Sequence, residues 1–234
     1  RSKYMAACLS DELGILAYGN AIFDAYSDLN LGRFIANGGQ LQAGGNATVR
    51  AITALDGFAL VALGTVTLGA DMAASIASDN LLMSGGSVSS CGCRTGGATL
   101  ISLGGSVNVN LHSITGVFDM LASAIDGDAN VHVATGDLGI NDLAGRNIAV
   151  TLPGGTLTLV NPVSSGGDYI LTARDFGGNT LRPVMGGGAT RLNNVSITDM
   201  EGDLALDGLL TAAGDISVRS AGNITGLLSL LASG

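Results

Sequence analysis

Apolar and polar side chains alternate at every second residue along much of this chain. Between residues 106 and 111, Ser, Asn and Asn alternate with Val, Val and Leu. Between residues 128 and 133, Asp, Asn and His alternate with Ala, Val and Val. A period of two residues is typical of a β-strand with one buried and one exposed face. The pattern therefore predicts an all-β protein made of short strands.

Glycines separate these strands at a regular interval of about 20 residues, a length typical of one unit in a repeat protein. The first series precedes a small polar residue and a strand, and comprises Gly45, Gly64, Gly86, Gly105, Gly127, Gly145, Gly167 and Gly188. The second series lies half a period away and comprises Gly97, Gly116, Gly136, Gly155, Gly178, Gly202 and Gly222. A unit this short cannot bury its apolar face alone, so it must stack on copies of itself.

Aligning the first five glycines predicts which side chains point inward. The residues two positions after each glycine are predicted to stack in the core, and they are Ala47, Val66, Val88, Val107 and Ala129. The residues three positions after it are predicted to point outward, and they are Thr48, Thr67, Ser89, Asn108 and Asn130. Parallel strands stack about 4.8 Å apart. The alignment therefore predicts a parallel β-solenoid with about 20 residues per coil.

The first 38 residues follow this repeat less closely than the rest. Five of the nine aromatic residues lie there, namely Tyr4, Tyr18, Phe23, Tyr26 and Phe34. Two interpretations are open: irregular coils of the same solenoid, or a cap or junction with a preceding segment. We therefore divide the chain into this segment, 1–38, and the β-solenoid repeats, 39–234.

The composition agrees with a narrow solenoid. The 234 residues include 37 Gly and no Trp, and 12% of them are charged. Glycine permits tight corners, and a thin column of aliphatic side chains has little room for large rings. Like charges stacked on successive coils repel, which favours a low charged fraction. Three prolines exclude collagen, and a hydrophobic fraction of 47% excludes disorder.

Charge and hydropathy limit the partners. The chain has 10 Lys and Arg against 19 Asp and Glu, a net charge of −9, with no basic cluster. Binding to phosphate backbones requires such a cluster, so we expect no nucleic acid partner. No stretch of about 20 mostly apolar residues occurs, so we expect no membrane span.

Three C-terminal segments show the repeat most clearly: Gly202-Asp-Leu-Ala-Leu, Gly214-Asp-Ile-Ser-Val and Gly222-Asn-Ile-Thr. This unit resembles the repeats of filamentous-haemagglutinin-like adhesins, which use two-partner secretion, and autotransporter passengers share it. The resemblance covers roughly residues 38–226. It implies a right-handed parallel β-helix that is secreted to the bacterial cell surface and serves adhesion or biofilm structure.

These observations predict a structural or adhesive module of an extracellular bacterial β-solenoid fibre. Exposed end strands can pair between molecules, so we expect self-association, end to end into filaments or laterally. Glycans on host or neighbouring cells are a second expected partner. The alternative is a β-helical protein that binds or degrades polysaccharides.

Candidate chemistry is sparse. His112 and His132 are both predicted to point outward and lack a third metal ligand. Polysaccharide-degrading enzymes need clustered carboxylates, often with a basic residue. Two sets of residues are candidates for such a cluster: Asp137, Asp142 and Arg146, and Asp168, Arg174 and Asp175.

Cysteine and glycine motifs add no clear site. Cys91 and Cys93 lack the second cysteine pair of a zinc site, and Cys8 is distant in sequence. The glycines at 186–188 belong to no phosphate-binding motif. We therefore expect no enzyme, and no catalytic, metal or cofactor site.

Overall fold

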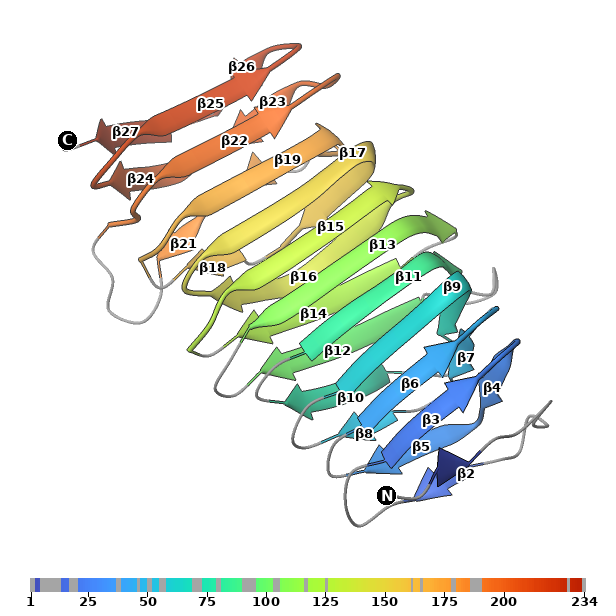
Figure 1. Ribbon diagram of the computed structural model, residues 1–234. Coiled ribbons are helices and arrows are strands. Elements are labelled where there is room, and N and C mark those ends of the chain that lie inside the picture. Colours follow the sequence, from blue (N-terminus) through green and yellow to red (C-terminus); the bar gives the residue numbers. More distant parts are fainter. Residues whose placement is uncertain are drawn as a thin grey trace.

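The computed structural model describes residues 3–4, 14–16, 21–36, 39–45, 47–49, 52–54, 58–68, 73–78, 81–89, 96–102, 106–115, 118–124, 126–160, 162–164, 166–177, 180–185, 191–226 and 228–232. Over these ranges all regular elements are β-strands. None of the described segments forms a helix with the length and apolar character needed to cross a membrane. Figure 1 shows the strands stacked along one axis, with the chain termini at opposite ends.

One stack, which we call the long sheet, runs the length of the molecule (Figure 1). Its strands are β1 (Lys3–Tyr4), β3 (Ala21–Ala25), β6 (Gly39–Ala43), β9 (Phe58–Leu68), β11 (Leu81–Ser89), β13 (Val107–Thr115), β15 (Ala129–Thr135), β17 (Ile148–Leu159), β19 (Tyr169–Asp175), β22 (Val195–Asp199) and β25 (Ile216–Ser220). Each pairs in parallel with the next. Two short strands, β4 (Leu29–Leu31) and β7 (Ala47–Val49), join it through β9. The long sheet therefore begins within the segment 1–38.

Other parallel stacks form the remaining sides of the coils. Behind the long sheet in Figure 1 lie β10 (Ala73–Ser78), β12 (Gly96–Ser102), β14 (Phe118–Ala124), β16 (Leu138–Gly145), β18 (Pro162–Ser164) and β21 (Val184–Met185). Smaller stacks are β2 (Gly14–Leu16) with β5 (Arg33–Ala36) and β8 (Ile52–Ala54), and β20 (Thr180–Leu181) with β23 (Leu204–Leu206) and β26 (Ile224–Thr225). A last pair is β24 (Gly208–Ala212) with β27 (Leu228–Ala232).

The strand registers define the coil. In the long sheet, Asn130 lies opposite Ala149, and Ala149 lies opposite Ile170. The separation between such partners ranges from 18 residues (Ile22 opposite Gln40) to 26 residues (Leu82 opposite Asn108). A coil averages roughly 21 residues. The predicted all-β parallel solenoid is confirmed, with coils of unequal length.

The core is a column of mainly aliphatic side chains. In β15, Ala129, Val131 and Val133 are buried, whereas Asn130 and His132 between them are not. The same alternation recurs in β16, β17, β19 and β22. Tyr169 is an exception in type, because its ring is fully buried and its hydroxyl has no hydrogen-bond partner among the described residues. Burial raises the pKa of that hydroxyl.

The predicted inward register is right in part. Val107 is fully buried and lies opposite Ala129, as the glycine alignment predicts. The alignment is wrong one coil earlier, because Val88 lies opposite Ile114, and Val107 lies opposite Leu81. Equal coil lengths were assumed in the alignment, and the 26-residue step between β11 and β13 breaks that assumption. The first glycine series therefore joins two different corners of the solenoid.

The second glycine series marks a true corner at Gly136 and Gly155. Gly136 has a φ of 102°, a conformation that side chains with a Cβ rarely adopt. A Cβ on Gly155 would overlap the carbonyl oxygen of Gly136 on the preceding coil. Glycine is needed at this corner because the backbones of two coils come together there.

Candidate functional site

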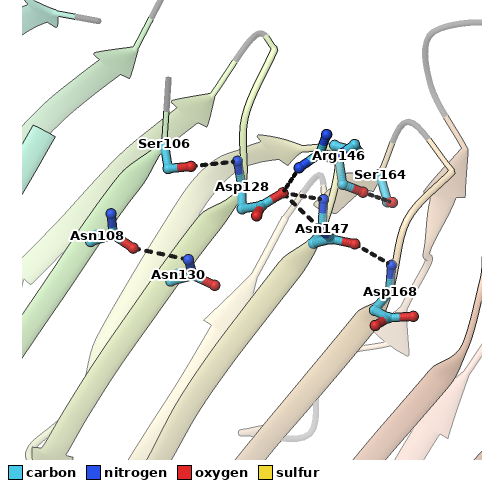
Figure 2. A network of polar contacts seen from close by, with 8 residues as sticks. All are labelled: Ser106, Asn108, Asp128, Asn130, Arg146, Asn147, Ser164 and Asp168. Atoms are coloured by element: carbon cyan, nitrogen blue, oxygen red, sulfur yellow. Dashed lines mark hydrogen bonds and ion pairs between the residues drawn. The ribbon is translucent and has the colours of Figure 1, made fainter. Parts of the chain in front are cut away.

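A row of small polar residues lies at one corner of the solenoid, directly before the strands of the long sheet. We call this row the corner ladder, and its members are Ser106, Asp128, Asn147, Asp168, Asn194 and Asp215. The strands that follow them start in register, so the six residues lie one above another. Figure 2 shows the first four.

Side-chain oxygens connect each member of the corner ladder to the backbone of the next coil. Ser106 Oγ accepts a hydrogen bond from the N–H of Asp128, and Asp128 Oδ1 accepts one from the N–H of Asn147. The same bond recurs up to Asp215, with oxygen-to-nitrogen distances of 3.0, 3.3, 2.8, 3.2 and 3.1 Å in chain order. Five consecutive steps between coils are therefore bridged at this corner.

Carboxylates and amides alternate along this corner ladder. Asn147 Nδ2 donates to Asp128 Oδ1 at 2.8 Å, and Asn194 Nδ2 donates to Asp168 Oδ1 at 2.9 Å. Carboxylates on adjacent coils would repel one another. An amide between two carboxylates separates the charges and supplies a donor, and hydrogen bonds to an ionised acceptor are the stronger kind. The alternation therefore permits acidic residues at a stacked position.

Neighbouring side chains add further donors to the same carboxylates. Arg146 Nη2 lies 3.2 Å from Asp128 Oδ1, and Asn193 Nδ2 lies 2.6 Å from Asp168 Oδ1. The Arg146 carbonyl oxygen accepts a hydrogen bond from Ser164 Oγ at 2.9 Å (Figure 2). The Arg146 side chain is well exposed, so its ion pair contributes little to stability compared with the hydrogen bonds to backbone.

Carboxylates at other corners also hold backbone N–H groups. Asp199 is almost fully buried, and its Oδ1 accepts hydrogen bonds from Gly202 N at 2.7 Å and Glu201 N at 3.2 Å. Its Oδ2 accepts a longer bond, 3.4 Å, from Phe176 N. Asp137 Oδ1 accepts a hydrogen bond from Thr156 N at 2.9 Å. These acidic side chains fix turns of the backbone.

The two histidines lie on the outer surface of the long sheet. Both side chains are exposed, as predicted. The residue opposite His132 is Asn110, so His112 and His132 are not register partners. Among the described residues, no three His, Cys, Asp or Glu side chains form a group that could hold a metal ion.

The two candidate carboxylate sets are not assembled around their arginines. Arg146 forms its ion pair with Asp128, which belongs to neither set. Arg174 pairs with Glu201 at 3.7 Å. Asp168 precedes β19, whereas Arg174 and Asp175 are at its far end, which places them about 20 Å away at 3.3 Å per residue.

The cysteines Cys8, Cys91 and Cys93 and the glycines at 186–188 lie outside the described residues. Residue-level reasoning missed the corner ladder, although a signal for it exists in the sequence. An Asp, Asn or Ser directly precedes each strand of the long sheet from β13 to β25. The separations of 22, 19, 21, 26 and 21 residues obscured that signal.

The outer surface of the long sheet contains a shallow hollow of about 460 Å³ over β13, β15 and β17. The hollow is lined by Asn108, Val109, Asn110, Asn130, Val131, His132, Ala149 and Thr151. The side chains of Val109 and Val131 are buried in the core, so these residues contribute backbone atoms to its floor. Polar groups of the remaining lining residues surround that floor.

Comparison of the chain with protein-family models, with curated proteins and with solved structures finds no match.

Proposed function

We propose that this chain is a structural and adhesive module of an extracellular bacterial β-solenoid fibre. The corner ladder is the observation that carries the proposal. Its polar side chains bind the neighbouring coils of the same rod, with five consecutive bridges from Ser106 to Asp215. The resemblance of the Gly-Asp-Leu units to surface adhesin repeats supports an extracellular location.

The mechanical argument follows from the direction of these bonds. Parallel strands in a solenoid form their backbone hydrogen bonds along the rod axis, and the corner ladder adds side-chain bonds in the same direction. A hydrogen bond to a charged group contributes about 1.5–3 kcal/mol. A pull along the axis therefore has to break several bonds at each step, which suits a load-bearing spacer.

Self-association is the partner that we propose for the rod. Among the described residues, β25, β26 and β27 are paired along one edge only, with β22, β23 and β24. The side chain of Ile224 in β26 is 50% exposed. Unpaired strand edges accept further strands, so this coil offers a surface for a second copy.

Electron microscopy and analytical ultracentrifugation of the purified chain over a range of concentrations test this proposal. We expect rods that lengthen along their axis as concentration rises. Ile224→Asp should abolish the lengthening without unfolding, because the side chain is already half exposed. The matched control is Val160→Asp, since Val160 is 52% exposed on the coil formed by β17 and β18.

Rods of constant length at all concentrations, or equal effects of the two substitutions, would contradict end-to-end assembly. Release of reducing sugars from a polysaccharide by the purified chain would instead support the enzymatic alternative.

A further inference from the structure

The hollow on the long sheet arises from a change in side-chain size between successive coils. Ala149 lies between Asn130 on the preceding coil and Ile170 on the following coil. Both neighbours have larger side chains than the single Cβ of Ala149. The outer surface is therefore lowest over β17, and Ile170, 39% exposed, adds an apolar contact on the coil beyond.

Amide groups give the hollow its hydrogen-bonding capacity. Asn130 Nδ2 donates to Asn108 Oδ1 at 2.9 Å, which orients both side chains (Figure 2). Each Asn amide offers two donor hydrogens and two acceptor lone pairs, and this contact uses one site on each. Asn110 lies opposite His132, and both side chains are exposed. Donors and acceptors are thus present together in two adjacent rows.

The charge of the lining selects among ligands. The hollow contains no carboxylate, guanidinium or ammonium group, and the whole chain has a net charge of −9. Acidic ligands are disfavoured by that net charge, and cationic ligands lack a partner in the lining. An uncharged ligand rich in hydroxyl groups matches the mixed donors and acceptors, and its C–H face can contact the His132 ring and Ala149.

We infer that this hollow binds an uncharged oligosaccharide. The inference rests on the proposed adhesive function, since it names the chemical class that the module would adhere to. Its volume, about 460 Å³, falls within the range of small-molecule sites. The sugar hydroxyls would bind Asn108, Asn110 and Asn130, and the His132 ring would pack against one sugar face.

Nuclear magnetic resonance titration of the full chain with uncharged hexasaccharides, one of β-1,4-linked glucose and one of β-1,4-linked mannose, tests this inference. A hexasaccharide of galacturonic acid serves as the charged comparator. We expect saturable shifts, with at least one uncharged sugar, of backbone amides in β13, β15 and the first half of β17. The acidic sugar should bind more weakly.

Ala149→Arg fills the hollow from an outward position and should weaken binding about tenfold or more, a change of about 1.4 kcal/mol. Ser217→Arg is the matched control, because Ser217 lies in the same outward row, which runs through Ile170 and Ser196. His132→Ala removes the ring and should also weaken binding. Circular dichroism and the thermal unfolding midpoint establish that each variant is folded.

The inference is overturned if neither uncharged sugar produces shifts, if Ala149→Arg and Ser217→Arg bind equally, or if the acidic sugar binds best. Concentration-dependent shifts of the same amides without sugar would identify lateral self-association instead. Failure of the fibre proposal is distinguishable, because Ile224→Asp should abolish axial assembly and leave sugar binding unchanged.

Discussion

At the scale of single residues, the order of Asp and Asn along the corner ladder decides whether the coils can stack there. Asp128, Asn147 and Asp168 occupy three successive coils, and the central amide donates to the carboxylate before it. Its Oδ1 accepts the N–H of the residue after it at 2.8 Å. A single side chain thus satisfies groups on two coils and separates two negative charges.

Asn147→Asp should lower the free energy of unfolding by about 2 kcal/mol at pH 7, because it removes a donor to a carboxylate. It also brings three carboxylates together, which favours their protonated forms in the folded state. The loss should therefore grow as pH rises and shrink as pH falls toward about 4, where carboxylates of model peptides titrate. Urea-induced unfolding at several pH values measures this effect.

Asn108→Asp is the control for that experiment. Asn108 accepts the amide of Asn130 through Oδ1, and a carboxylate can accept the same bond. No carboxylate lies opposite, since its register partners are Leu82 and Asn130. Its stability should be close to that of the unmodified protein, and an equal loss in both variants would show that alternation of charge is not the cause.

At the scale of elements, the strands are similar and the corners differ. The strands β15 and β17 share the same inward alternation, whereas the turns between them vary in length and in the groups that fix them. Gly136 and Gly155 mark a corner where two backbones meet, and Asp199 fixes another through three N–H groups. Substitutions at corners therefore test the stacking geometry more directly than substitutions on strand surfaces.

Gly155→Ala should destabilise the protein by about 2–3 kcal/mol, because the added Cβ overlaps the Gly136 carbonyl oxygen and forces a backbone shift. Gly208→Ala is a useful comparison. Gly208 has a φ of 110° but nothing within 4 Å of a Cβ, so it should cost only the backbone strain, about 1 kcal/mol. Thermal and urea unfolding of both variants measure the difference. A larger loss for Gly208→Ala would refute the overlap explanation.

At the scale of the whole molecule, the solenoid is nearly one-dimensional. Each strand of the long sheet contacts the strand before it and the strand after it, so most of the structure depends on neighbouring coils. A defect inside the column should therefore weaken the adjacent coils first. Figure 1 shows β13 near the middle of the rod, where a defect would affect coils on both sides.

Val107→Asp should destabilise β13 and its neighbours by about 4 kcal/mol or more, because Val107 is fully buried and its site offers no partner for a charge. Hydrogen exchange should show lost protection in β11, β13 and β15 and smaller changes in β22 and β25. Asn108→Asp, on the adjacent outward position, should leave protection unchanged. Uniform loss of protection along the whole rod would contradict this neighbour-limited picture.

The sequence by itself determined the strand type, the parallel solenoid and the inward positions within each strand. Val107 and Ala129 were predicted to be buried and opposite each other, and they are. This works because alternation is a local property of extended backbone, and because a repeated short unit has few ways to bury its apolar face.

Only the tertiary structure decided which coils and side chains meet. Val88 faces Ile114 because one coil step has 26 residues, and a glycine marks a corner without saying which corner it is. Arg146 binds Asp128, 18 residues away, and does not bind the carboxylates nearer in sequence. Contacts between coils depend on the summed lengths of all intervening turns, and a difference of a few residues changes which polar groups come within hydrogen-bonding distance.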